Sequence, residues 1–205
     1  MAIKLQPFID THAPGENLQP ASVELVARYR NHLPASLIEL WQTHGFGFYG
    51  DGLIQLINPE QYQDNLWGWL MYDEEDMSRL PIALSAFGDI LYFRNLTGEE
   101  DEALDEEEDE VDVAFIDPHT SQTCSLVWPL EEFFSDFCCD DEVIEEFFCR
   151  SRLLQTRELK GELAADEIYY HVPAIRLGGD GEPANSDKGN ASVQLDLLLQ
   201  MALGS

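Results

Sequence analysis

A run of acidic residues near the middle of the chain limits how the sequence can fold. Ten of the twelve residues from Glu99 to Glu110 are Asp or Glu. Like charges at this density repel one another and cannot pack into a core. Because apolar segments typical of strands lie on either side, at 90–94 and 111–116, the run is predicted to be the solvated connection of a β-hairpin.

Three roles are open to this acidic run. It fits a calcium loop poorly, because counting from Asp101 places Ala103 at the third position and Glu106 at the sixth, where such loops need glycine. It can be a solvated loop without a specific role. It can also steer or dock a basic partner.

The charge of the whole chain narrows the classes of partner. Lys and Arg total 11 against 40 Asp and Glu among 205 residues, which gives a formal net charge of -29. Such a field repels nucleic acids and anionic membranes and attracts basic proteins. We therefore expect no direct nucleic-acid binding and no membrane association. At this length, with 44% apolar residues, the chain can form one large domain or two small ones.

Cysteine usage and the N-terminal residues indicate a cytoplasmic protein. No apolar run of about 18 residues is present, and the first residues lack the basic and apolar regions of a signal peptide. The four cysteines, Cys124, Cys138, Cys139 and Cys149, show no CxxC spacing. They are predicted to be reduced thiols in the core.

The first third of the chain is predicted to contain helices and one hairpin. Residues 22–33 and 34–45 have helical apolar spacing, with Pro34 expected at the first helical position and Gly45 as a stop. Asp51-Gly52 between two apolar runs is typical of a hairpin turn. Asn58 is predicted to cap a further helix, with Tyr62, Leu66, Trp69 and Leu70 on its apolar face.

The rest of the chain alternates between strand and helix patterns. Strands are expected within 80–94, turning near Gly88-Asp89, and within 111–128, turning near Pro118-His119. Helices are expected at 130–137 and 140–161, and two apolar segments flank a glycine-rich loop near the C-terminus. The predicted fold is α+β: a small helical and hairpin N-terminal domain, 1–76, packed on a mostly antiparallel, helix-covered sheet in 77–205.

The sequence offers little catalytic chemistry. Residues 45–50, GFGFYG, match the letters of the GxGxxG dinucleotide motif, but a helix is expected before them and a strand after them, the reverse of what that motif needs. Residues 178–183, GGDGEP, lack the Gly-Lys-Ser/Thr ending of a phosphate loop. The five histidines are scattered singly. We expect no cofactor, no metal site and no enzymatic activity.

Three stretches resemble a known family. Residues 33–70 resemble the GAD-like domain, with an LP-initiated helix, then W…GF…Y..G, then NP..Y. Residues 80–93, with AFGD, and 168–179, with Y…PA..LGG, are similar to the companion C-terminal domain. Most of the recurring residues read as fold determinants: Trp41, Gly45, Phe46, Tyr49, Gly52, Asn58, Pro59, Tyr62, Ala86, Phe87, Gly88, Asp89, Pro173, Leu177 and Gly179.

Proteins of this two-domain type are similar to immunity proteins of type VI secretion systems, especially those paired with DNase toxins. The resemblance implies a cytoplasmic, non-catalytic inhibitor of a cognate effector with a basic surface. The alternative is an acidic DNA mimic or regulator that binds a basic host protein. The oligomeric state is left open.

The partner-binding surface is predicted to join three acidic places along the chain. Tyr49, Trp67 and Tyr72 are expected to be exposed anchors beside them. Trp67 and Trp69, two apart on a helix, cannot both face inward. The predicted surface comprises Tyr49, Asp51, Trp67, Tyr72, Asp73, Glu74, Glu75, Asp76, Glu106, Glu107, Glu108, Asp109 and Glu110.

Overall fold

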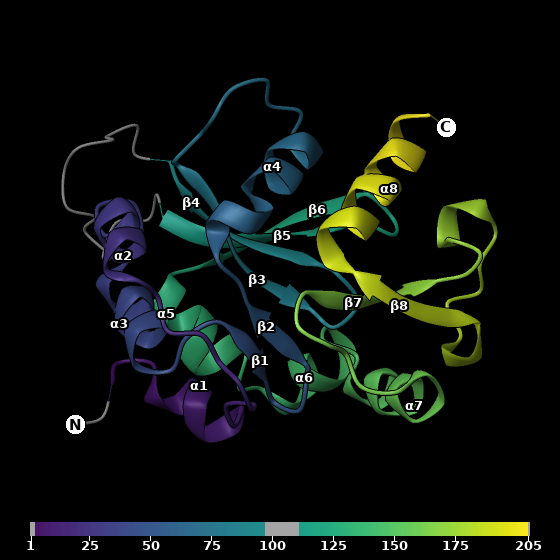
Figure 1. The fold of residues 1–205 in the computed structure, drawn as a ribbon, viewed down its shortest axis with the longest axis horizontal. Coiled ribbons are helices and arrows are strands. Elements are labelled where there is room, and N and C mark those ends of the chain that lie inside the picture. The colour runs from purple at the N-terminus through teal and green to yellow at the C-terminus, as the bar shows by residue number, and fades with distance from the viewer. Residues whose placement is uncertain (1–2, 97–110, 205) are drawn as a thin grey trace.

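The computed structural model describes residues 3–96 and 111–204, and its centre is one antiparallel sheet (Figure 1). Each strand pairs with the next one along the chain, so the spatial order follows the sequence order. The strands are β1 (Gly47–Tyr49), β2 (Ile54–Leu56), β3 (Arg79–Ser85), β4 (Ile90–Asn95), β5 (Val111–Asp117) and β6 (Gln122–Trp128). This meander confirms the predicted α+β fold with a mostly antiparallel sheet.

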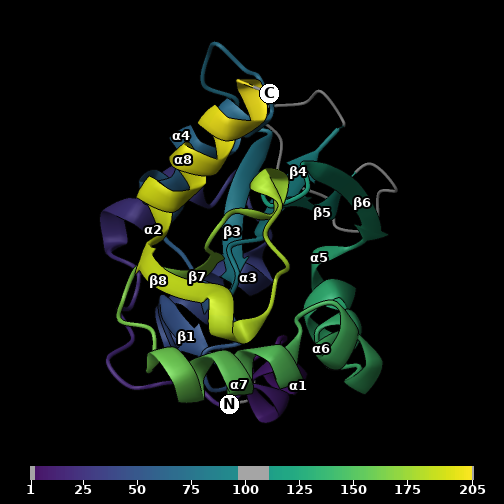
Figure 2. The same ribbon diagram turned by 90° about the vertical axis from the view of Figure 1, so that its right-hand side faces the viewer.

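Helices cover both faces of this sheet, and a second, two-stranded sheet lies beside it (Figures 1 and 2). The small sheet pairs β7 (Glu167–His171) with β8 (Ser186–Asn190). The α-helices are α1 (Gln6–Thr11), α2 (Val23–Tyr29), α3 (Ala35–Thr43), α4 (Pro59–Trp69), α5 (Leu130–Glu132), α6 (Asp141–Glu146), α7 (Arg150–Lys160) and α8 (Ala191–Leu203). A π-helical turn, Phe133–Phe137, and short 3₁₀ turns at Ile175–Leu177 and Pro183–Asn185 complete the set.

The sheet is buried on both faces because its apolar side chains alternate between two cores. On β4, Leu91 and Phe93 belong to the larger core, which also contains side chains of α1–α3 and of the 130–153 region. Ile90 and Tyr92 on the same strand belong to the smaller core, with α4 and α8. This period of two is what a strand with both faces covered requires.

Local signals set the ends of most helices. Ser22 accepts a hydrogen bond from the backbone N–H of Leu25 at the start of α2, and Asn58 accepts one from the backbone N–H of Glu60 at the start of α4.

Two predictions about helix bounds are wrong in detail. Pro34 precedes the first residue of α3 and is its cap. The expected helix over 140–161 is two helices, because Cys149 between them has a left-handed backbone, φ 56°.

The cysteine prediction is only partly met. All four cysteines are free thiols, but only Cys138 is buried; Cys139 and Cys149 are half-buried, and Cys124 is exposed. The position of Cys124 on β6 explains this, since β6 is the last strand of the sheet and has a neighbour on one side only. Burial raises the pKa of the Cys138 thiol well above its ordinary value.

The six strands form one sheet across residue 76, where the domain boundary is predicted. β2 pairs with β3, with Ile54 opposite Ser85 and Leu56 opposite Ala83. The division into 1–76 and 77–205 stays a prediction.

Within the described ranges, no helix has the length and apolar character needed to cross a membrane.

Candidate functional site

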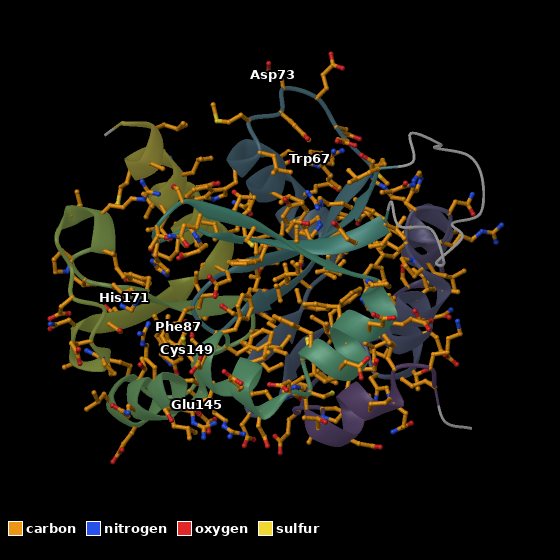
Figure 3. The ribbon with its side chains drawn as sticks, turned by 180° about the vertical axis from the view of Figure 1, so that it is seen from behind. Trp67, Asp73, Phe87, Glu145, Cys149 and His171 are labelled. Carbon is orange, nitrogen blue, oxygen red and sulfur yellow. The ribbon has the colours of Figure 1, made fainter. Side chains whose placement is uncertain are left out.

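Four exposed residues of the predicted site, Tyr72, Asp73, Glu74 and Glu75, lie in the connection from α4 to β3, residues 71–78, called here the acidic link. Figure 3 shows Asp73 on a loop that stands away from the body of the protein, whereas Trp67 lies below it, closer to the sheet. Met71 is 67% exposed and Tyr72 38% exposed, and Asp73, Glu74 and Glu75 are also exposed. The link therefore presents two apolar side chains beside three free-standing carboxylates.

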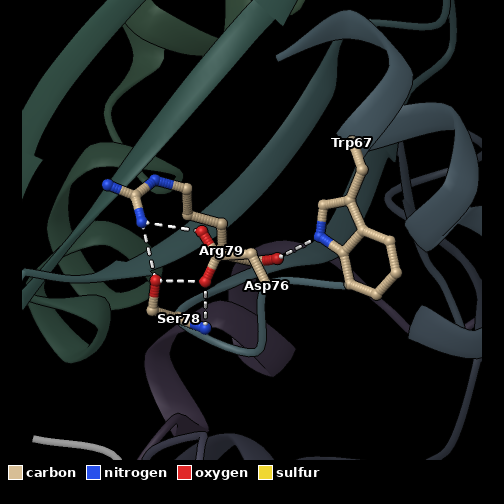
Figure 4. Close-up of polar contacts among 4 residues, drawn as sticks. All are labelled: Trp67, Asp76, Ser78 and Arg79. Atoms are coloured by element: carbon tan, nitrogen blue, oxygen red, sulfur yellow. Dashed lines mark hydrogen bonds and ion pairs between the residues drawn. The ribbon is translucent and has the colours of Figure 1, made fainter. Parts of the chain in front are cut away.

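A set of hydrogen bonds fixes the base of the acidic link (Figure 4). Asp76 Oδ1 accepts from the backbone N–H of Ser78, at 2.9 Å, and from its hydroxyl, at 2.5 Å. Asp76 Oδ2 accepts from Arg79 Nη1 at 2.9 Å, which pairs the two charges. Asp76 therefore has a structural role in the link and contributes less unpaired charge than its neighbours.

Arg79 also connects this base to the tip. Its guanidinium carbon lies 5.6 Å from the centre of the Tyr72 ring, within the range of a cation–π contact. Its backbone carbonyl oxygen accepts a hydrogen bond from the indole N–H of Trp67 at 3.2 Å. Both ends of the link are thereby held, one by the last turns of α4 and one by β3.

The strand that precedes the acidic run, β4, ends beside this link. The backbone N–H of Asn95, at the end of β4, donates to the carbonyl oxygen of Ser78 at 2.8 Å. Arg94 forms two hydrogen bonds with Asp112, at 2.7 and 2.5 Å, which join the strand before the run to the strand after it. The run itself, with the predicted residues Glu106, Glu107, Glu108, Asp109 and Glu110, lies outside the described residues.

The hairpin tip at Asp51 lies at the other end of the sheet. The strand registers place Ile54 opposite Ser85, and the backbone N–H of Ala86 donates to Leu53, so the β1–β2 turn lies near the β3–β4 turn. The seven residues of β3 separate this end from the acidic link by about 20 Å at 3.3 Å per residue. The single surface predicted from the sequence is thus two surfaces.

Two of the three expected anchors are not exposed. Tyr49 is fully buried: its hydroxyl donates to the carbonyl oxygen of Gly45 at 2.6 Å and its ring packs near Phe8. Trp67 is 6% exposed. The reason is that α4 is covered on two sides, by β3 and by α8, so Trp67 faces inward and Trp69 is half-buried. Tyr72 alone is exposed as predicted.

The sequence analysis did not identify the exposed apolar side chains of this site. It also did not identify the contacts of Asp76 with Ser78 and Arg79, called here the clamp. Met71 and Leu96 are 67% and 45% exposed, and apolar residues in a polar stretch are the signal that could have identified them. The clamp depends on Arg79, whose partner three residues earlier is visible in the sequence as a single Asp-x-x-Arg pair. Within residues 3–96 and 111–204, no group of three or more His, Cys, Asp or Glu is placed to hold a metal. The arrangement is suited to binding a protein.

Comparisons with known proteins identify the class of protein. Residues 4–102 match the family model of the GAD-like domain. Residues 129–202 match the family described as T6SS immunity protein Tdi1, C-terminal. The two matches follow one another in the order that the sequence resemblance predicted, a GAD-like domain and then a domain similar to that of type VI secretion system immunity proteins. Residues 80–93, which resembled the companion domain, fall within the GAD-like match.

A solved structure has the same fold. The crystal structure of Atu4351 from Agrobacterium tumefaciens superposes with a TM-score of 0.71 at 20% identity, covering 95% of this chain and 88% of that chain. At this identity the likeness concerns the fold alone. No curated protein matches the chain in sequence.

Proposed function

We propose that this protein is a cytoplasmic immunity protein that binds and neutralises one cognate type VI secretion effector. The observation that carries the proposal is the match of residues 129–202 to the Tdi1 immunity family, preceded by a GAD-like domain at 4–102. The acidic link supports a binding role, because it offers exposed carboxylates and apolar side chains on a fixed base. Inhibition would act by occupying a surface of the effector, without catalysis.

The charge of the chain favours a DNase as the effector. A nuclease must present a positive surface to the phosphates of its substrate. An inhibitor of net charge -29 is attracted to such a surface and competes with DNA for it. Attraction of this kind raises association rates from about 10⁵–10⁶ to 10⁸ or more per molar per second at low salt, which suits the capture of an incoming toxin.

The test uses the effector encoded beside this chain in its source genome. The purified effector is incubated with plasmid DNA and with increasing amounts of this protein, and DNA cleavage is measured. We expect cleavage to stop when the two proteins reach equal molar amounts. Undiminished cleavage at a tenfold molar excess of this protein contradicts the immunity role.

Two further outcomes separate the parts of the proposal. An effector that kills cells without cutting DNA, and is rescued by this protein, contradicts only the DNase assignment. Complete protection at far less than one inhibitor per effector contradicts a binding mechanism and indicates catalytic inactivation. Growth of cells that co-express the two proteins provides the readout for the first outcome, and the plasmid-cleavage titration provides it for the second.

A further inference from the structure

A large groove lies where the two family regions meet. Its volume is about 1220 Å³. One side is formed by residues between Pro14 and Gln61, within the GAD-like region, and the other by residues between Leu153 and Tyr169, within the Tdi1-type region. Figure 1 shows β1 and β2 between α1 and α7. Residues of β1, β2 and α7 are among those that line this junction groove. Neither region forms it alone.

The floor of the junction groove contains a buried amide without a partner. Phe48 on β1 lies opposite Gln55 on β2, so both side chains project from the same face of the sheet and both line the groove. Gln55 is 4% exposed, and its side-chain oxygen has no hydrogen-bond donor within the described parts of the chain. Buried polar atoms are nearly always paired, so this acceptor lacks its expected donor. The oxygen is covered in this structure, so a donor from a bound partner reaches it only when neighbouring side chains move aside.

The rim of the groove is acidic. Six carboxylates line it, against two guanidinium groups, and both guanidinium groups are engaged within the protein. Arg28 pairs with Glu60 at 2.8 Å, and Arg157 Nη1 donates to the backbone oxygen of Asp51 at 3.0 Å. The six carboxylates are Glu16, Glu24, Asp51, Glu60, Glu162 and Asp166. This rim repels anions and attracts Lys and Arg side chains.

We propose that the junction groove binds a basic segment of the effector. Lys or Arg side chains of the segment pair with rim carboxylates such as Glu16 and Glu162. Its apolar side chains pack on Phe48, and one of its N–H groups donates to the Gln55 amide oxygen. The identity of the partner rests on the proposed function, whereas the chemistry of the segment follows from the groove itself.

The groove gives Asp51 a place in the binding surface although Asp51 is far from the acidic link. Asp51, predicted to share a surface with the acidic link, lies about 20 Å from it by strand length but lines this groove. A partner that contacts both the acidic link and the groove therefore has to span the sheet from one end to the other. The acidic link supplies long-range attraction at an exposed tip, and the groove supplies the desolvated contacts from which most affinity arises.

A peptide titration tests the groove independently of the effector. The probe is a blocked peptide of alternating Lys and Leu with one Arg, added to ¹⁵N-labelled protein. We expect the largest shift changes at the Gln55 side-chain amide and the Phe48 backbone amide. Charge reversal at the rim, Glu16→Lys with Glu162→Lys, is expected to weaken binding about tenfold. Both residues are exposed, so the fold is retained, which circular dichroism checks.

The matched control reverses two exposed carboxylates outside the groove, Glu146→Lys with Glu158→Lys. It changes the net charge by the same amount, and we expect peptide binding to weaken less than about threefold. A second variant, Gln55→Leu, removes the buried acceptor and is expected to weaken binding about fivefold. Equal loss in rim and control variants, or shift changes spread over the whole acidic surface, overturns the proposal.

The effector then distinguishes this proposal from the proposed function. If the rim variant and the wild-type protein inhibit the effector equally, the groove proposal is overturned while the immunity role stands. If the peptide binds in the groove but the effector is neither bound nor inhibited, the assignment of the segment to an effector is overturned together with the proposed function. Loss of inhibition in the rim variant, with the control variant unaffected, supports both.

Discussion

The indole N–H of Trp67 donates a hydrogen bond to the backbone carbonyl oxygen of Arg79, with 3.2 Å between the two atoms. This bond ties the C-terminal half of α4 to the first residue of β3 and closes the loop formed by the acidic link. Arg79 in turn pairs with Asp76. The exposed tip is thus presented on a fixed base, and a binding loop that is ordered beforehand loses less conformational freedom on association.

Asp76→Ala is expected to lower the free energy of unfolding by about 1–3 kcal/mol, because Ser78 and Arg79 both lose their acceptor. Asp73→Ala removes the same group three residues earlier, where it is exposed, and is expected to change stability by less than about 0.5 kcal/mol. Urea unfolding of the two variants measures the difference. Equal losses would show that the clamp contributes nothing specific.

Charge reversal at the tip, Glu74→Lys with Glu75→Lys, is expected to slow association with the effector about tenfold at low salt and to leave dissociation nearly unchanged. The reason is that exposed charges act mainly on the encounter and are screened within about 8–10 Å at cellular salt. Stopped-flow binding at several salt concentrations measures both rates.

The control for the tip is Glu146→Lys with Glu158→Lys, two exposed sites on α6 and α7. It alters the net charge equally but at another place. If both double variants slow association to the same extent, only the net charge matters and the tip has no special position.

The sequence predicted elements whose causes are local. Asp51-Gly52 and Gly88-Asp89 mark turns because their backbones adopt left-handed conformations at Asp51, Gly52 and Gly88, and both hairpins form as expected. Asn58 caps α4 because its side-chain oxygen accepts a hydrogen bond from the backbone N–H of Glu60. Such signals require only a few neighbouring residues.

Features that depend on distant packing could not be predicted in this way. α4 is buried on a further side because α8, more than 120 residues later, covers it there: Asn65 is 4% exposed, and its side-chain amide donates to the backbone oxygen of Ser192 and to the carboxylate of Asp196. The helical pattern over 140–161 gives no sign that Cys149 interrupts it. The junction groove joins segments about 100 residues apart, and the sequence identified only Asp51 among its acidic residues.

Gly88→Ala is expected to destabilise the protein more than Gly178→Ala. Both glycines have a left-handed backbone, with φ 88° and 89°, so either substitution costs about 1 kcal/mol in backbone strain. At Gly88 the added carbon would also lie 2.6 Å from Ile168 Cδ1, whereas at Gly178 it meets nothing within 4 Å. The free energy of unfolding of Gly88→Ala should therefore be lower than that of Gly178→Ala by about 1–3 kcal/mol, the cost of overpacking. Thermal unfolding of the two variants measures the difference. Indistinguishable melting temperatures would contradict close packing of the β3–β4 turn on β7.

The carboxyl group of Asp89 predicts a pH dependence of stability. Burial, reinforced by the nearby negative charge of Asp117, raises the pKa of Asp89 from 3.8 to about 7, although the hydrogen bond from Ser85 opposes the change. Between these two pH values the folded protein holds a proton that the unfolded chain has released. The contribution of Asp89 to stability is therefore fully present below about pH 4 and is lost as the pH rises towards 7.

Asp89→Asn tests this dependence, because the amide is neutral at every pH. The free energy of unfolding of the wild-type protein, relative to that of the variant, should fall by on the order of 2–4 kcal/mol between pH 4 and 7, at about 1.4 kcal/mol per pKa unit. The difference between the two proteins is needed because burial lowers the pKa of His171 to about 4, and His171 acts in the same interval with the opposite sign. Since His171 is present in both proteins, its contribution cancels. A difference that stays constant with pH would mean that Asp89 is ionised throughout this range, with its charge stabilised by the Ser85 hydroxyl and Arg152.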